Sequence, residues 1–411
     1  MNYTRWDRHK EGVVTNLRVL VTTSTYPYTG HEYWGNFVED LNTRMEEQGV
    51  AIGTVVPKCR CTKRIQKNRL GTTEFSYFLP KQMQTLGCPP GLEHNSRSLH
   101  GKMQLPFYLI AFTLNLFAAT IRRKPHLIHA SWAIPSGLVS WIVGKITHTP
   151  VLVTVYGADV YQKGLRKLVI KFVLERVDHV VVVSHHAKRL LHQFAKPKKL
   201  TVIPNAIDVN EVVSTKKRIN PSEIKKRMNI DPRDIVVLTV RRLVVEKRIA
   251  DLVEAAAKVL LQEHNVTFAI GGSGPELDNL QKLAEDLKIQ NKIKFLGAIT
   301  EEEKIELLSI ADICVQPSVQ EGLSLALLEF MASGATVIAS TTAGQSDIIK
   351  HNENGLLFNA TDTDALAEMI IECIRNKNSN LGERARKLVL EKYSLDIHTA
   401  RYKKVYAEFL N

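Results

Sequence analysis

Short apolar runs alternate with segments of helical periodicity along the first half of the chain. Near-continuous apolar strands that are separated by helices are typical of a parallel sheet covered on both faces. The pattern therefore predicts an α/β unit in this half. We expect strands at 17–22, 50–56, 126–129, 150–155, 179–183 and 200–203, and helices at 34–48, 105–121, 134–146, 164–176 and 185–195.

The alternation stops after Pro204-Asn205 and resumes after a polar, basic segment at 210–233. The second half therefore predicts another doubly wound unit, with its ligands bound beyond the carboxyl ends of the strands. We place the domains at 1–205 and 206–392, with a final helix at 393–411. We expect strands at 235–240, 266–271, 292–296, 312–316 and 335–339, and helices at 221–229, 249–263, 275–287, 301–310, 323–333, 343–350, 362–376, 381–392 and 395–410.

Charge is distributed unevenly over the 411 residues, which carry a formal net charge of +13. Residues 1–205 contain 28 Lys and Arg against 12 Asp and Glu, whereas residues 206–411 contain 27 against 30. A basic first half suits an anionic substrate or an anionic membrane surface. The sequence has no aromatic RNA-binding signature, helix-turn-helix signal or zinc spacing, so nucleic acid is the least favoured of the three possible partners and we expect none.

Four further features bear on location. The five cysteines are irregularly spaced and do not resemble a disulfide framework, which predicts a reducing, cytoplasmic compartment. The polar start of the chain is unlike a signal peptide. The uncharged stretch 105–121 is short for a membrane span, and a buried helix is favoured over a membrane-touching one. A basic loop could meet anionic lipid, although a solvated loop is slightly favoured; its cations are Lys58, Arg60, Lys63, Arg64, Lys67 and Arg69.

The run from Glu321 to Glu329 carries the clearest chemical signal. A turn-forming Gly322 and an N-cap candidate, Ser324, precede a Leu- and Ala-rich stretch of high helix propensity. Glu321 should therefore lie just before a helix and Glu329 about two turns along it. The helix N-terminus between them favours an anion such as phosphate. For this fragment alone, the sequence is equally compatible with two exposed glutamates that have no function.

Two other segments of the second half lie at carboxyl ends of strands. A cationic cluster follows strand 235–240, where Arg supplies a fork for phosphate oxygens and Lys a point charge; it comprises Arg241, Arg242, Lys247 and Arg248. The glycine-rich loop Gly271–Pro275 opens a helix, but it lacks both Gly-x-Gly-x-x-Gly and a P-loop. That loop is as compatible with a tight turn as with a ligand loop.

The first half offers polar clusters at three carboxyl ends. Gly30 and His31 follow the first strand, His129 ends another, and Tyr156 and Asp159 follow the strand at 150–155. Because carboxyl ends of parallel strands share one edge of the sheet, these groups should converge on one cleft wall.

These motifs together resemble the retaining nucleotide-sugar glycosyltransferases of group 1 (family 4) from about residue 17 to about residue 410. The most specific match is the Glu321–Glu329 run, flanked by Gln316-Pro317-Ser318 and Met331-Ala332-Ser333-Gly334. Supporting matches are Ile203-Pro204-Asn205-Ala206-Ile207-Asp208, Arg242-Leu243 with Glu246-Lys247, the Gly271–Pro275 loop, Phe295-Leu296-Gly297 and Asn354-Gly355-Leu356-Leu357. The resemblance implies two Rossmann-like domains facing a cleft, the GT-B fold.

The resemblance also implies a division of labour. The second domain would bind a UDP-, GDP- or ADP-sugar, and the first would bind a glycan or lipid-linked acceptor. Arg242 and Lys247 would neutralise the leaving diphosphate, Glu329 would hold the ribose, and Glu321 would face the sugar. Further donor contacts would come from Gly30, Gly272, Gly297, Ala298, Gly322, Leu323 and Ser324. The acceptor side would include His31, Asp159 and Asn205, and no metal or other cofactor would be needed.

Two positions depart from the family pattern. Tyr156 stands where family members often carry a His that contacts the donor sugar or helps catalysis. Either Tyr156 keeps only the binding role, or His129 or His31 contributes. Arg241 stands where a Gly often precedes the Arg, which adds charge to the diphosphate loop. The alternatives to transfer are a nucleotide-sugar epimerase with this fold and a non-catalytic protein that binds sugar nucleotides.

Overall fold

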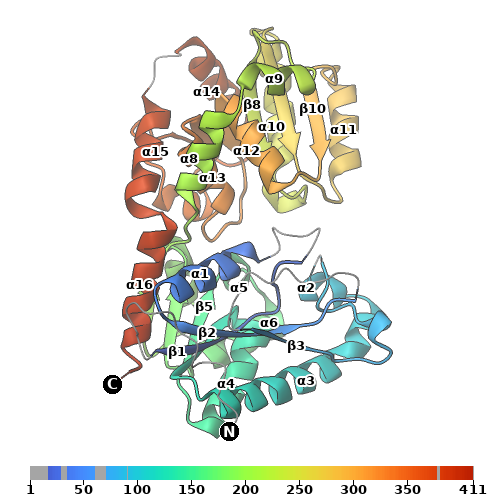
Figure 1. Cartoon of the computed structure of the whole chain (residues 1–411). Coiled ribbons are helices and arrows are strands. Elements are labelled where there is room, and N and C mark those ends of the chain that lie inside the picture. Colours follow the sequence, from blue (N-terminus) through green and yellow to red (C-terminus); the bar gives the residue numbers. More distant parts are fainter. Residues whose placement is uncertain (1–16, 29–34, 61–70, 90, 377–379, 411) are drawn as a thin grey trace. The chain divides into compact units, whose positions relative to one another are not determined.

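The computed structural model describes residues 17–28, 35–60, 71–89, 91–376 and 380–410, and it divides into two compact units (Figure 1). The first unit runs up to Val183 and includes Ala187–Pro204 and the chain from Leu395 onward. The second unit comprises Asn205–Ser394 together with Ser184–His186. The final helix therefore belongs to the first unit, although the whole second unit separates the two in sequence.

The first unit is built on a parallel sheet of seven strands in the order β3-β2-β1-β4-β5-β6-β7. Its strands are β1 (Arg18–Thr22), β2 (Ala51–Pro57), β3 (Thr72–Phe75), β4 (Leu127–Ser131), β5 (Val151–Val155), β6 (His179–Val182) and β7 (Leu200–Val202). The sequence pattern missed β3, an edge strand of mostly polar residues that pairs only with β2. Edge strands need little apolar burial, so they leave a weak signal.

Alternate residues of these strands face two separate hydrophobic cores. Leu20 packs with α3 (Leu99–Arg123), α4 (Leu138–Thr147) and α6 (Gly164–Leu174), whereas its neighbours Val19 and Val21 pack with α1 (Asn36–Glu47) and α16 (Leu395–Ala407). This alternation follows from the two-residue period of a strand. The remaining helices of this part are α2 (Leu92–Asn95), α5 (Gly157–Val160), α7 (His185–His192), and the short turns η1 (Lys81–Met83) and η2 (Ala133–Gly137).

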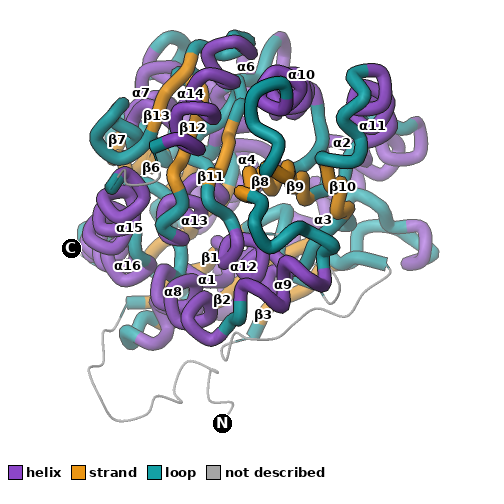
Figure 2. Tube along the Cα trace, turned by 90° about the horizontal axis from the view of Figure 1, so that it is seen from above, coloured by secondary structure: helices purple, strands orange, loops and turns teal. Residues whose placement is uncertain are grey.

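The second unit contains a parallel six-stranded sheet in the order β10-β9-β8-β11-β12-β13, and β8, β9 and β10 lie side by side in Figure 2. Its strands are β8 (Ile235–Val240), β9 (Val266–Gly271), β10 (Ile293–Gly297), β11 (Ile313–Gln316), β12 (Thr336–Ser340) and β13 (Leu356–Phe358). The three-residue β13 was not predicted. It extends the sheet by pairing with β12, which a sequence pattern of three residues cannot indicate.

Helices cover both faces of this sheet (Figure 2). One core joins the strands to α10 (Ile249–Leu260), α11 (Leu277–Asp286) and α14 (Thr363–Arg375). On the other side lie α8 (Val209–Arg218), α9 (Pro221–Arg227), α12 (Glu301–Ile310), α13 (Leu325–Ser333) and α15 (Leu381–Lys392). The short turns are η3 (Val245–Lys247) and η4 (Ala343–Asp347). Two doubly wound α/β units are therefore present, as predicted.

One cysteine pair corrects the expectation drawn from spacing. Cys59 and Cys88 form a disulfide, with Cα atoms 4.9 Å apart. The end of β2 and the loop before α2 bring the two sulfur atoms together, and both are buried beside Tyr28. A separation of 29 residues gave no sign of this contact in the sequence. Cys314 and Cys373 are free.

Candidate active site

The carboxyl end of β8 presents three cationic side chains in the second unit. Arg241 and Arg242 follow the strand directly, and Lys247 lies in the turn η3 that leads into α10. Arg241 and Lys247 are both buried, whereas Arg242 is exposed. Alternation explains the first two positions, because successive residues leaving a strand point to opposite sides.

The carboxyl end of β11 leads through Glu321 into α13. Ser324 is the N-cap of this helix, and its hydroxyl accepts from the backbone N–H of Leu327 at 3.2 Å. Gly334 ends the helix in a left-handed conformation with φ 81°. Glu321 therefore precedes the helix and Glu329 lies in its second turn. Within the same unit, the amide of Asn205 donates to the carbonyl oxygen of Leu323 (2.9 Å) and supports the loop.

Glu321, Arg241 and Lys247 form a buried charged cluster. Lys247 Nζ lies 2.6 Å from Glu321 Oε1, and the Arg241 guanidinium contacts the same carboxylate oxygen. Arg241 also donates to the hydroxyl of Ser324 at 2.9 Å. Two cations therefore share one carboxylate, and the exposed Arg242 adds a further positive charge. The cluster carries a net positive charge beside the N-terminus of α13, which is suited to binding an anion.

Burial governs the electrostatics of these cations. Together with smaller contributions from the neighbouring Arg241 and Arg242, it lowers the pKa of Lys247 to about 6. Burial also lowers the pKa of Arg241, with a smaller contribution from Arg242. Both effects express the cost of gathering positive charge away from water. An anion bound at this position would relieve that cost, since it would stabilise the charged forms.

The glycine-rich loop after β9 has a packing explanation. A Cβ at Gly272, whose φ is 134°, would overlap the carbonyl oxygen of Arg241, and a Cβ at Gly274 would overlap that of Leu243. The backbone N–H of Leu243 in turn donates to the carbonyl of Ser273 at 2.9 Å. The glycines thus let this loop lie directly against the segment that carries Arg241. Gly297, with φ 69°, accepts from the N–H of Gly272 at 2.7 Å, and Ala298 beside it is exposed.

Glu329 lies in a separate polar group on α13. Its Oε1 accepts from Lys304 of α12 at 2.7 Å, and Lys304 also contacts Glu301 at 2.5 Å. The two carboxylates raise the pKa of Lys304 despite the opposing effect of burial. Lys304 was not predicted from the sequence. Its only signal there is its position three residues after Glu301, the first acidic residue of a predicted helix. The contact with Lys304 fixes one oxygen of the carboxylate.

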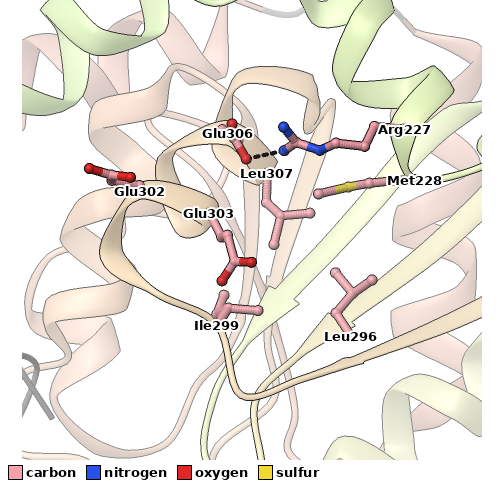
Figure 3. A pocket seen from close by; sticks show the side chains of 8 residues that line it. All are labelled: Arg227, Met228, Leu296, Ile299, Glu302, Glu303, Glu306 and Leu307. Carbon is pink, nitrogen blue, oxygen red and sulfur yellow. Dashed lines mark hydrogen bonds and ion pairs between the residues drawn. The ribbon is translucent and has the colours of Figure 1, made fainter. Parts of the chain in front are cut away.

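A cavity of about 310 Å³ lies elsewhere on the second unit, between α9, the end of β10 and α12 (Figure 3). Three glutamates of α12 line it, and one of them, Glu306, pairs with Arg227. Leu296 and Ile299, which flank the predicted Gly297 and Ala298, form part of its apolar wall. Because its charged lining is mostly acidic, this cavity is poorly suited to a diphosphate.

In the first unit, Tyr156 belongs to an aromatic cluster at the carboxyl ends of β4 and β5. Its ring centroid lies 5.0 Å from those of Phe37 and Trp132. Trp132 has a left-handed backbone with φ 69°, a conformation uncommon outside glycine. Burial raises the pKa of Tyr156 well above its usual value. The phenol therefore stays protonated at neutral pH and cannot act as a general base.

The structure argues against a catalytic role for His129. Its side chain is buried, with Nδ1 2.6 Å from the Tyr406 hydroxyl and Nε2 2.8 Å from the Thr154 hydroxyl. Burial lowers its pKa to about 3, so the ring is neutral. Both ring nitrogens are engaged inside the core, where they connect the sheet to α16. The sequence placed His129 correctly at a strand end but could not show which way its side chain points.

Asp159 also has structural partners. Its two carboxylate oxygens accept from the backbone N–H groups of Ala133 (3.1 Å) and Tyr156 (2.9 Å). Burial raises its pKa to about 7. Asp159 thus joins the loop after β4 to the loop after β5. Gly30 and His31, the other residues predicted for this edge, lie outside the described residues, as do Lys63, Arg64, Lys67 and Arg69. No group of three metal-ligating side chains occurs among the residues that the structure describes.

Comparison with known protein families identifies both halves of the chain. Residues 35–211 match the model described as Glycosyltransferase Family 4, and residues 221–388 match the model described as Glycosyl transferases group 1. The chain belongs to the group 1 glycosyltransferases.

Curated relatives agree with this assignment. The chain is 28% identical to N-acetyl-alpha-D-glucosaminyl L-malate synthase of Bacillus anthracis over 316 residues, which cover 75% of this chain and 81% of the relative. It is 24% identical to alpha-monoglucosyldiacylglycerol synthase of Streptococcus pneumoniae over 390 residues, which cover 93% and 85%. Both relatives are named as synthases of sugar-containing products.

Solved structures show the fold. Sucrose-phosphate synthase of Thermosynechococcus elongatus superposes with a TM-score of 0.79 at 22% identity, covering 96% of this chain and 99% of that one. HepE of Anabaena, solved with UDP and glucose, gives a TM-score of 0.76 at 17% identity, with coverages of 96% and 100%. The two parallel-sheet units therefore constitute a GT-B fold, as the resemblance implied.

Proposed function

We propose that this protein transfers a sugar from a nucleotide-diphosphate sugar to an acceptor hydroxyl, with retention of configuration and without a metal ion. The observation that carries the proposal is the buried cluster of Glu321, Arg241 and Lys247 beside the N-terminus of α13. Breaking a sugar–phosphate bond places negative charge on the diphosphate, and positive groups held in advance stabilise that charge.

The proposed roles follow from charge. Lys247 and Arg242 bind the diphosphate as it leaves, and Arg241 holds Glu321 and Ser324 in position. Glu321 lies next to these cations, where it faces the sugar ring as positive charge develops there. The acceptor hydroxyl attacks from the face that the diphosphate leaves, which retains configuration. Glu329, anchored by Lys304, binds the ribose hydroxyls through its carboxylate.

The proposed acceptor is a glycan or a lipid-linked glycan, and the proposed location of the protein is a membrane surface. The names of two relatives support a lipid acceptor: the Streptococcus pneumoniae enzyme above, and the GDP-mannose-dependent alpha-(1-6)-phosphatidylinositol monomannoside mannosyltransferase of Mycobacterium tuberculosis. The solved complexes of HepE with UDP and with UDP-glucose support a nucleotide-sugar donor.

The donor site is tested by titrating UDP-, GDP- and ADP-sugars calorimetrically into the wild type and three variants. Lys247→Met should weaken binding about tenfold or more, since a charge-assisted contact to phosphate is lost. Glu329→Gln should weaken binding of the nucleotide sugar but not of inorganic diphosphate. Arg233→Ala, which removes an exposed cation of the same unit, is the matched control and should bind normally.

Product analysis separates transfer from the alternatives. Mass analysis of a mixture of donor and acceptor should show a glycosylated acceptor, and NMR of the new linkage should show the anomeric configuration of the donor. A changed donor sugar in the absence of acceptor would indicate an epimerase. Donor binding without any turnover across a broad acceptor panel would indicate a non-catalytic protein. Loss of activity on chelation would contradict the metal-free mechanism.

A further inference from the structure

The outward face of α3 is apolar along its whole length, which corrects the expectation of a buried helix. Among the described residues this is the one helix long and apolar enough to span a membrane by length and composition. One side of α3 packs on the sheet through Tyr108, Phe112 and Leu116. The opposite side is exposed, including Ile110 at 59% and Leu114 at 61%. Its exposed apolar residues are Leu99, Met103, Phe107, Ile110, Leu114, Phe117 and Ile121.

The spacing of these residues makes a continuous stripe. Successive members are three or four positions apart, which places them on one side of a helix. The residues that pack on the sheet follow the same period on the opposite side. A helix that serves only the core of a soluble protein would carry polar residues on its outer side. The outer side of α3 thus has the composition of a second buried face, although none of the described residues of its unit covers it.

The neighbouring helices extend this apolar surface. α4 packs beside α3, and Trp141 of α4 contacts Phe172 of α6 with ring centroids 5.0 Å apart. α4 adds Ile146, which is 59% exposed, and α6 adds Leu165 and Leu168, which are 76% and 63% exposed. In Figure 1, α3, α4 and α6 lie in the same part of the first unit. We call the outward side of these three helices the α3 surface.

The charges on the α3 surface have a single sign. There is no Asp or Glu between Glu93 and Asp159, and none in α6. Exposed cations lie at both ends of α3, on α4 and along α6; they are Lys102, Arg122, Lys145, Lys163, Arg166 and Lys171. Arg166 pairs with Glu93 at 3.1 Å and Lys171 lies 4.0 Å from Glu175, so these two are partly neutralised. An apolar centre with a cationic border is typical of a helix that lies in the interface of an anionic membrane.

We propose that the α3 surface docks the protein onto an anionic lipid bilayer, with α3 lying along the interface. This inference rests on the membrane location proposed above and names the surface responsible. A membrane-spanning α3 would have to withdraw Tyr108, Phe112 and Leu116 from the core of the sheet. Pairing with a second copy would bring the same cations into opposition without carboxylates to match them. A bilayer of anionic lipids satisfies both the apolar stripe and the charges.

Co-sedimentation of the full chain with lipid vesicles tests the proposal. Wild-type protein should bind vesicles of phosphatidylcholine with phosphatidylglycerol, bind phosphatidylcholine alone weakly, and release partly at high salt. Replacing two exposed residues, Ile110→Ser with Leu114→Ser, should lower binding about a hundredfold, because each apolar side chain contributes roughly a factor of ten. Leu261→Ser replaces an 81% exposed leucine of the second unit and should change binding less than about twofold.

Two further measurements make each result decisive. Nucleotide-sugar binding by the double variant should equal that of the wild type, so loss of vesicle binding with intact donor binding supports the α3 surface independently of catalysis. Equal vesicle binding by the double variant and the wild type would overturn the proposal. Absence of wild-type binding would also overturn it. If the wild type is a dimer, the double variant is a monomer and neither binds vesicles, the α3 surface would instead be assigned to pairing with a second copy.

Discussion

Arg241 shows how a single residue can alter a family site. The resemblance alone indicated only that Arg241 adds charge to the diphosphate loop. The structure instead places the guanidinium between Glu321 and the N-cap hydroxyl of Ser324. One side chain therefore fixes a carboxylate and the start of α13 together. The pairing could not be read from the sequence, since the two partners lie 80 or more positions away and only the fold brings them together.

Replacement of Arg241 should lower the free energy of unfolding without changing the fold. Arg241→Met keeps the apolar stem but removes the contacts to Glu321 and Ser324. We expect a loss of about 2 kcal/mol in the free energy of unfolding, because a buried carboxylate loses one of its two cations. Urea denaturation measures this loss. Arg233→Ala removes an exposed ion pair with Asp231 and should cost much less, and an equal cost for both variants would contradict the bridging role.

At the scale of elements, close contacts between loops position the cations. The loop after β9 supports the segment after β8 only because its glycines have no side chains. The sequence left this loop undecided between a tight turn and a ligand loop. The packing against Arg241 and Leu243 accounts for Gly272 and Gly274 without invoking a ligand. Regular elements were easier to predict, because long apolar strands such as β8 and helices such as α13 carry their own periodic signal.

Gly272→Ala should disturb this arrangement strongly. Its added Cβ would overlap the Arg241 carbonyl, so the loop must move, and we expect a loss of about 3 kcal/mol or more together with weaker donor binding. Gly164→Ala is the matched control, since Gly164 also has a positive φ (58°) but nothing lies within 4 Å of a Cβ there. That control should cost only about 1 kcal/mol. Thermal unfolding and calorimetric titration of both variants distinguish the two effects.

At the scale of the whole molecule, the sequence predicted the two α/β units and the uneven charge. It did not predict the disulfide between Cys59 and Cys88 or the exposed side of α3. Hydropathy reports how apolar a segment is, but not which of its sides is covered, so a helix such as α3 is interpreted as core. The directions of buried polar side chains such as His129 were hidden for the same reason.

Buried titratable groups should make stability depend on pH. The pKa of His129 falls from 6.5 in the unfolded chain to about 3 in the folded protein. Below pH 6.5 the unfolded chain therefore binds a proton that the folded protein does not, and the free energy of unfolding decreases. His398, lowered to about 4, acts in the same direction, whereas Asp159, raised to about 7, opposes it. Between pH 7 and pH 5 the contribution of His129 alone should fall by about 2 kcal/mol.

The His129→Gln variant isolates this contribution. It should be less stable than the wild type at pH 7, because the contacts to Tyr406 and Thr154 are altered. The difference in unfolding free energy between the two should shrink by about 2 kcal/mol at pH 5, because glutamine does not titrate. Urea denaturation at both pH values measures it. A difference that is the same at pH 5 and pH 7 would show that His129 does not govern the acid sensitivity.

The place of α16 has a consequence for the order in which the protein is made. Tyr402 and Tyr406 complete the core beneath β1, β4 and β5, yet they follow the whole second unit in the sequence. Residues 205–394 form a continuous unit that is fully synthesised before them. The segment translated second can therefore finish folding first, while that side of the first unit's sheet is covered by α1 but still lacks α16.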